Sequence, residues 1–276
     1  MLLRYMSLKY GLEALRTGEF KVTRPCDAND PYEMMGGLHG RLSDRVRGEF
    51  CNSVAMGWAR EAVNPTNRRI ILPLRKVLND AWNNFEKTLA IKILSRETFD
   101  KNESFLCFAD ADQVTDETDQ LMWAHYGECG RGVRIWFDEE RLKEVYPLIR
   151  PIVYQEQRPT LELDRLTSWG DADELKEFIG ECYFTKSQAW AYEHEKRLLI
   201  FRSMGEQLKT RRGDIELIRI PIDAITRVDF GPMGMTDEMF AAITEFQAIE
   251  RMKHIEFRVA TFTQNTYSYS YDLVES

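Results

Sequence analysis

The stretch that decides the fold is Trp190-Ala191-Tyr192-Glu193-His194-Glu195-Lys196-Arg197, which runs directly into Leu198-Leu199-Ile200-Phe201. Its last four residues are large and apolar, and a run this short beside charged residues predicts a strand buried on both faces. Such a strand needs a neighbour on each side. We therefore expect strands from both ends of the chain to pair in one sheet that forms a cleft.

The charged residues before the apolar run are candidates for chemistry. Side chains alternate along a strand, so extending the strand backwards places Glu193, Glu195 and Arg197 in one row. Two carboxylates at the end of a buried strand contribute little to its stability, because each disfavours ionisation of the other. The alternative is a solvated strand end with salt bridges, since structural ion pairs cluster in the same way.

The remaining pattern predicts a single α+β domain over residues 1–276, with a mixed, mainly antiparallel sheet and a helical insertion at about residues 38–100. Turn signals and hydrophobic periodicity separate the elements. Strands are predicted at residues 2–6, 20–23, 104–109, 133–137, 151–154, 215–220, 226–230, 255–262 and 267–271. Helices are predicted at residues 8–16, 74–89, 121–126, 171–182 and 236–252.

Composition excludes several classes of protein. A net charge of -8 argues against broad, non-specific binding to nucleic acid, which needs a basic face. The five cysteines are odd in number and widely spaced, which is typical of reduced thiols in a cytoplasmic protein and not of a disulfide framework or a zinc site. No apolar run approaches the length of a membrane span, so we expect no membrane partner.

Several polar and aromatic motifs together resemble a known family. They are Arg4-Tyr5, the Gly-Leu-Glu-Ala-Leu-x-x-Gly segment at residues 11–18, Asn29-Asp30-Pro31-Tyr32-Glu33, Trp123-Ala124-His125-Tyr126, Arg131-Gly132-Val133, and Lys-x-x-x-Trp-x-Tyr-Glu-x-Glu-x-Arg at residues 186–197. In this order they resemble a large bacterial family known as domain of unknown function 2971. The resemblance runs from Leu3 to about Phe201, and it implies no settled activity.

A second resemblance, to the ADP-ribosyltransferase superfamily, suggests an activity. It lies in the opening strand, the helix, Gly18 and the strand at residues 20–23. Members place an Arg or His in the first strand and a catalytic Glu, often as Glu-x-Glu, at a later strand. The resemblance implies that Arg4 takes the first role, Glu195 the catalytic role and Glu193 that of the upstream carboxylate. The chain departs from many members at Cys107-Phe108-Ala109, where they have a segment like Ser-Thr-Ser.

The implied reaction is cleavage of the nicotinamide–ribose bond of NAD and transfer of ADP-ribose to an acceptor, a protein or a nucleic acid. The superfamily resemblance also suggests a role as a toxin or a phage-defence effector. No metal is expected. The implied binding residues for NAD, or for another nucleotide, are Arg4, Tyr5, Arg24, Asn29, Asp30, Trp123, His125, Tyr126, Lys186 and Arg197.

Two alternatives stay open. The first is a hydrolase of nucleic acids or nucleotides, in which Glu193, Glu195 and Asp30 hold a divalent metal and Lys186 contacts phosphate, because oxygen ligands suit magnesium. The second is a non-catalytic module whose aromatic-rich cleft recognises a small molecule or a partner. Taken singly, each motif also has an ordinary structural role. Asn-Asp-Pro commonly forms turns, and aromatic residues three apart on a helix usually face a core.

Overall fold

The fold was taken from a computed structural model, which describes residues 1–41, 43–49, 80, 82, 103–163, 172–201, 209–212, 215–233 and 236–274. The chain divides into two compact units. The first contains residues 1–28, 102–154 and 188–276, and the second contains residues 29–101 and 155–187.

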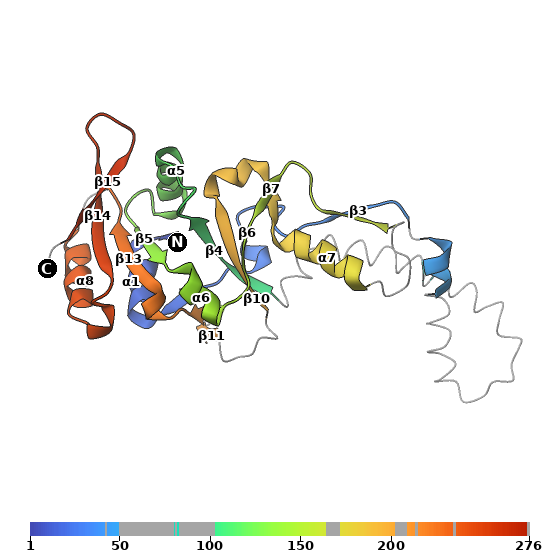
Figure 1. Cartoon of the computed structure of the whole chain (residues 1–276), viewed down its shortest axis with the longest axis horizontal. Helices are drawn as coiled ribbons and strands as arrows, with labels where there is room; N and C mark the ends of the chain where they lie inside the picture. Colours follow the sequence, from blue (N-terminus) through green and yellow to red (C-terminus); the bar gives the residue numbers. More distant parts are fainter. Residues whose placement is uncertain are drawn as a thin grey trace, which may run out of the picture. The chain divides into compact units, whose positions relative to one another are not determined.

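A large sheet forms the centre of the first unit. Within the described residues it has eight strands in the order β15-β14-β13-β5-β1-β4-β10-β6 (Figure 1). β13 and β14 pair in parallel, and the other neighbours pair antiparallel. The α+β class with a mixed, mainly antiparallel sheet is therefore confirmed. The strands are β1 (Leu2–Met6), β4 (Glu103–Asp110), β5 (Val133–Phe137), β6 (Ile149–Pro151), β10 (Glu195–Phe201), β13 (Ile225–Phe230), β14 (Glu256–Phe262) and β15 (Tyr269–Leu273).

The apolar run at residues 198–201 lies in β10, between β4 and β6. β4 pairs with the whole strand, and β6 pairs with residues 196–198. The prediction of neighbours on both sides is confirmed, and strands from both ends of the chain share the sheet. The backward extension of the strand was wrong. Residues before Glu195 form the 3-10 helix η4 (Gln188–Glu193), and His194 follows it with a φ of 45°.

One face of the sheet packs on the main hydrophobic core. Alternate side chains of the central strands point to it, and α1 (Leu8–Thr17), α6 (Glu139–Val145) and α8 (Asp237–Gln247) bury apolar side chains there. α1 ends at Gly18, whose φ of 73° lies in the left-handed region that glycine adopts without a Cβ clash. The short helices η7 (Ile222–Ala224) and η8 (Glu250–Met252) complete this layer.

The opposite face carries α5 (Asp116–Tyr126) and a smaller apolar cluster. Leu3 and Tyr5 of β1 contribute to it, together with Met122 and Trp123 of α5. Thr115 caps α5 by accepting a hydrogen bond from the backbone of Thr118. This face positions most of the side chains that the sequence marked as candidates.

A second, smaller sheet in the first unit has the order β11-β12-β2. Its strands are β2 (Glu19–Lys21), β11 (Lys209–Arg212) and β12 (Ile215–Arg219), and β12 pairs antiparallel with both neighbours. After β2, Thr23 forms an isolated antiparallel bridge with Phe105 of β4. The short helix η1 (Pro25–Asp27) follows.

The second unit contains β3 (Gly37–His39), β8 (Thr160–Glu162), β9 (Thr185–Ser187) and α7 (Ala172–Tyr183), while β7 (Val153–Gln155) leads into it. β3 and β8 pair in parallel. Leu161, Phe178 and Cys182 form its apolar cluster. Most of the helical insertion predicted at residues 38–100, including the helix predicted at residues 74–89, falls outside the described residues, and its described beginning includes β3.

The helices in the described part of the chain were compared with the length and apolarity that a membrane span requires. None of them meets both requirements.

Candidate functional site

The candidate site begins where β1 parts from β4. The two strands pair only through Leu2–Asp110 and Leu3–Ala109, although β4 continues back to Glu103. Arg4 follows the last residue of β1 that pairs with β4, and its Nη1 donates a 2.6 Å hydrogen bond to the carbonyl oxygen of Cys107. The Arg4 side chain thus provides a hydrogen bond to the Cys107 carbonyl at the point where β1 and β4 no longer pair with each other.

Glu195 lies beside this parting. Leu3, Ala109 and Glu195 are aligned in register across β1, β4 and β10. Burial lowers the pKa of the Arg4 guanidinium, and interactions with Cys107 and the Glu195 carboxylate act to raise it. Arg4 and Glu195, which are 191 positions apart in sequence, therefore interact electrostatically within one unit.

Arg197 holds Glu195 from within the same strand. Its Nε donates to Glu195 Oε1 over 2.8 Å, and both side chains are buried, at 0% and 2% exposure. The guanidinium carbon of Arg197 also lies 4.6 Å from the ring centroid of Phe105 on β4. Both charged groups have lost their hydration on burial, and the ion pair compensates for that loss. Separating them would leave two buried charges without a partner in this pair, so the contact holds Glu195 in a defined position.

Glu193 belongs to the turn before the strand and has a different partner. The hydroxyl of Tyr126, at the end of α5, donates to Glu193 Oε1. The ring of His125 lies 5.8 Å from that of Tyr192, and the ring of Trp190 lies 6.2 Å from that of Tyr192. The carboxylate and its aromatic neighbours thus come from two elements that contact each other, α5 and η4.

The positive φ of His194 separates the two carboxylates. The chain leaves the 3-10 helix at Glu193, reverses its course at His194 and enters β10 at Glu195. Glu193 and Glu195 therefore do not stand in one strand row, as the alternation of the sequence predicted. Glu193 ends a 3-10 helix and Glu195 begins a strand, and each is about 95% buried or more.

The other predicted residues fall into three groups. Tyr5 and Trp123 pack edge to face at 5.3 Å in a network centred on Arg134. The side chain of Arg24 pairs with Asp27 at 2.9 Å and is about one third exposed. Asn29, Asp30 and Lys186 belong to the second unit, where Lys186 Nζ lies 3.8 Å from Glu33 Oε2.

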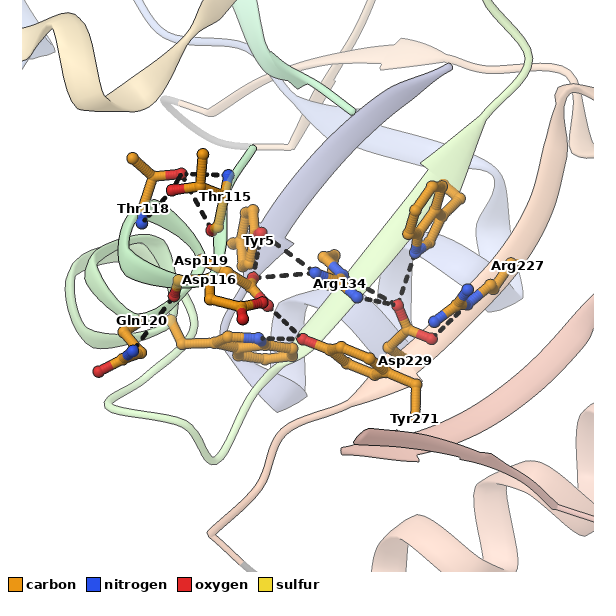
Figure 2. A network of polar contacts seen from close by, with 12 residues as sticks. Tyr5, Thr115, Asp116, Thr118, Asp119, Gln120, Arg134, Arg227, Asp229 and Tyr271 are labelled. Atoms are coloured by element: carbon orange, nitrogen blue, oxygen red, sulfur yellow. Dashed lines mark hydrogen bonds and ion pairs between the residues drawn. The ribbon is translucent and has the colours of Figure 1, made fainter. Parts of the chain in front are cut away.

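Arg134 forms a buried polar network that the sequence interpretation missed (Figure 2). Arg134 Nη1 lies 2.9 Å from Asp119 Oδ1, and its Nη2 lies 2.8 Å from Asp229 Oδ2. Asp119 also accepts hydrogen bonds from the hydroxyls of Tyr5 and Tyr271. Burial opposes the charge of Arg134, but Asp229 and its other partners raise the pKa of its guanidinium.

Asp229 is the second anionic centre of this network. It accepts hydrogen bonds from Trp136 Nε1 at 2.5 Å and from Arg227 Nε at 2.6 Å. The signal in the sequence was a charge inside an apolar strand segment, Arg134 in residues 133–137 and Asp229 in residues 225–230. Two guanidiniums balance two carboxylates, and every partner lies on α5 or on a strand of the sheet. The network has the chemistry of a structural clamp.

The described residues were also searched for metal ligands. Within the two units as described, no group of three or more His, Cys, Asp or Glu side chains is placed to hold a metal ion. Of the proposed magnesium ligands, Glu193 and Glu195 belong to the first unit and Asp30 belongs to the second.

Comparison with known proteins gives one match. Residues 122–198 match the model of a family described as a protein of unknown function, DUF2971. The matched segment begins in α5 and ends in β10, and it includes Tyr126, Glu193, Glu195 and Arg197. No curated protein and no solved structure matches the chain. The part of the resemblance that extends from Leu3 to residue 121 rests on the sequence motifs. The segment that carries both candidate carboxylates is similar to DUF2971.

Proposed function

We propose that the chain is an ADP-ribosyltransferase-like enzyme that cleaves the nicotinamide–ribose bond of NAD. The observation that carries the proposal is the interaction of Arg4, from the first strand, with Glu195, at the start of β10. These are the two positions to which the superfamily resemblance assigns the first-strand cation and the catalytic carboxylate. The support is that Leu3, the residue before Arg4, is in register with Ala109 and Glu195, and that the Glu195 carboxylate acts to raise the pKa of Arg4.

The reaction assigns a separate task to each group. As the C–N bond breaks, its electron pair leaves with nicotinamide, and the ribose becomes an oxocarbenium-like cation. Glu195 stabilises this cation, because a fixed carboxylate lowers the energy of positive charge that develops beside it. Arg197 holds that carboxylate in place. Arg4 binds a ribose or pyrophosphate oxygen, and Glu193 accepts the proton that the acceptor loses when it bonds to the ribose carbon.

The proposed reaction requires that NAD reach the buried carboxylate of Glu195. Glu193 and Glu195 are 5% and 3% exposed, and the hydroxyl of Tyr126 is bonded to Glu193. Because Glu195 is buried, NAD can reach its carboxylate only if neighbouring side chains move. Exclusion of water then strengthens the electrostatic effect of the carboxylate. In the proposed complex, Tyr126 and His125 pack against the nicotinamide ring.

The test is release of nicotinamide by the purified full chain from NAD labelled in the nicotinamide ring, with water or with candidate protein and nucleic-acid acceptors. Glu195→Gln should reduce release on the order of 100-fold or more, the usual cost of losing a transition-state electrostatic contact. The matched control is Glu245→Gln, which changes a carboxylate in an exposed ion pair with Arg16 and should release nicotinamide at the wild-type rate.

Three results would contradict the proposal. One is the absence of release by the wild-type chain with every acceptor. Another is an unchanged rate in Glu195→Gln, which would leave Glu195 a structural partner of Arg197. The third is magnesium-dependent cleavage of nucleic acid without release of nicotinamide, which would favour the hydrolase alternative. An active enzyme of this kind, transferring ADP-ribose to a cellular macromolecule, would suit a toxin or a phage-defence effector acting in the cytoplasm.

A further inference from the structure

The second unit contains a pocket that is independent of the proposed NAD chemistry. Its volume is about 290 Å³, at the lower limit of the roughly 300–1,000 Å³ usual for small-molecule sites. Its wall consists of residues of the second unit alone: Tyr32, Met35, residues 155–159, Cys182, Thr185, Lys186 and Ser187. A pocket of this size suits a ligand much smaller than a dinucleotide.

The walls of the pocket are fixed by backbone hydrogen bonds. Tyr32 is held by a turn in which its N–H donates to Asp30 Oδ1 over 2.8 Å. The segment at residues 155–159 is tied to β3, since Gly37 N donates to the carbonyl oxygen of Pro159 over 2.7 Å. Gly36 allows close contact with α7, because a Cβ there would lie 2.9 Å from Cys182 Sγ. The pocket is therefore preformed, which reduces the entropic cost of binding.

Two cations give the pocket its chemical character. The side chain of Lys186 is 3% exposed, and its Nζ lies 3.8 Å from the carboxylate of Glu33, at the long end of an ion pair. Arg158 is exposed, and its guanidinium carbon lies 5.5 Å from the ring centroid of Tyr32. Glu156 is the one acidic side chain in the described wall, and Glu33, which is outside the wall, pairs with Lys186.

Polar groups complete the lining. Gln155, Gln157, Thr185 and Ser187 provide amide and hydroxyl groups that can donate to oxygen atoms. We infer that the second unit binds a small organic anion, a carboxylate or a phosphate ester, in this pocket. Lys186 is the buried cationic contact and Arg158 the exposed one. An anion in the pocket gains charge-assisted hydrogen bonds from the ammonium group of Lys186 and the guanidinium of Arg158, both of which line it.

The test uses isothermal titration of the full chain with two probes, inorganic phosphate and malonate, which separate phosphate from carboxylate recognition. We expect saturable one-to-one binding of at least one probe. Arg158→Gln and Lys186→Met should each weaken it by about tenfold, as expected for loss of a charged hydrogen-bond donor. Lys176→Gln is the control, because Lys176 is an exposed lysine of α7 outside the pocket wall, and it should leave the affinity unchanged.

Hydrogen exchange locates the bound probe. Binding should slow exchange of the backbone amides at residues 155–159 and 185–187. Should Lys186→Met fail to fold, Arg158→Gln decides, since Arg158 lies at the surface. The inference is overturned if neither anion saturates the wild-type chain, if Arg158→Gln binds with wild-type affinity, or if protection appears only outside these two segments.

Discussion

Arg134 and Asp229 form a two-point contact between directly paired residues of β5 and β13. Arg134 Nε and Nη2 lie 2.9 and 2.8 Å from the same oxygen, Asp229 Oδ2. Asp229 is fully buried, and Arg134 is 4% exposed. Figure 2 shows Arg134 between this carboxylate and that of Asp119. The pair joins β5 to β13, and through Asp119, the other carboxylate that Arg134 contacts, it also connects α5 to these two strands.

Asp229→Asn should lower the free energy of unfolding by about 3–5 kcal/mol, because it leaves two buried or half-buried guanidiniums, those of Arg134 and Arg227, with Asp119 as the one remaining carboxylate of the network. The measurement is urea unfolding followed by tryptophan fluorescence, since Trp123 and Trp136 both contact Arg134. Glu245→Gln, in an exposed pair with Arg16, should change the same quantity by about 0–1 kcal/mol. A loss below about 1 kcal/mol for Asp229→Asn would refute the structural clamp.

The pair of Lys196 and Glu139 predicts a pH dependence of stability. Their charged atoms lie 2.9 Å apart, and Lys196 also lies 3.1 Å from Asp110. Burial acts to lower the pKa of Lys196, but its hydrogen bonds to the two carboxylates raise it above 10.5. Burial acts to raise the pKa of Glu139, but the hydrogen bonds from Lys196 and Lys143 lower it below 4.5.

The sign of the effect follows from these directions. The contribution of Lys196 is complete below pH 10.5 and is lost as the pH rises through its folded pKa. That of Glu139 is present above pH 4.5 and is lost as the pH falls through its folded pKa. Lys196→Met should therefore cost the most, about 2 kcal/mol, at neutral pH. Its difference from the wild type should shrink at both extremes, as measured by urea unfolding at about pH 3, 7 and 11.

Lys253→Met is the matched control, because Lys253 pairs with Glu250 at the surface. It should change the free energy of unfolding by less than about 1 kcal/mol, with little pH dependence. A Lys196→Met difference that stays constant across the pH range would show that altered packing of the side chain, and not the lost charge, causes the destabilisation.

Glu193→Gln should slow transfer of ADP-ribose to an acceptor more than hydrolysis of NAD. In the proposed mechanism Glu193 takes the acceptor's proton, while Glu195 still stabilises the oxocarbenium-like state. The measurement is the ratio of labelled acceptor to total nicotinamide released. Tyr126→Phe serves as the comparison, because it removes the hydroxyl bonded to Glu193 and keeps the carboxylate. Equal loss of transfer and hydrolysis in Glu193→Gln would rule out its role as the proton acceptor.

Local sequence patterns predicted helices and strands well where burial of apolar side chains or a glycine stop alone determines the element. The strands at residues 2–6 and 133–137 and the helix that ends at Gly18 follow from apolar runs and a left-handed stop. The extension of β10 back through residue 190 was wrong, because alternation was assumed across His194. A positive φ at a non-glycine residue leaves no mark in a single sequence.

For the candidate site, too, the sequence predicted some features and not others. The roles of Arg4 and Glu195 came from a resemblance, and their approach depends on strand order, which periodicity does not determine. The Arg134 network was missed for the same reason. A charge in an apolar strand predicts a buried partner, but naming Asp229 requires the register of β5 against β13.

The central place of β1 has a consequence for how the chain is made. Leu3 pairs with Trp136, 133 positions later in the sequence. At about 5–20 residues per second, a ribosome needs roughly 7–27 seconds to add those residues. Until β4 is made, 106 positions after Leu3, the apolar strand Leu-Leu-Arg-Tyr-Met has neither of its neighbours, and an unpaired strand edge can pair with another chain. Arg4 places a charge in the middle of the strand, and a charge in an apolar strand opposes aggregation, so we expect the side chain that later bonds to the Cys107 carbonyl to act first while the strand is unpaired.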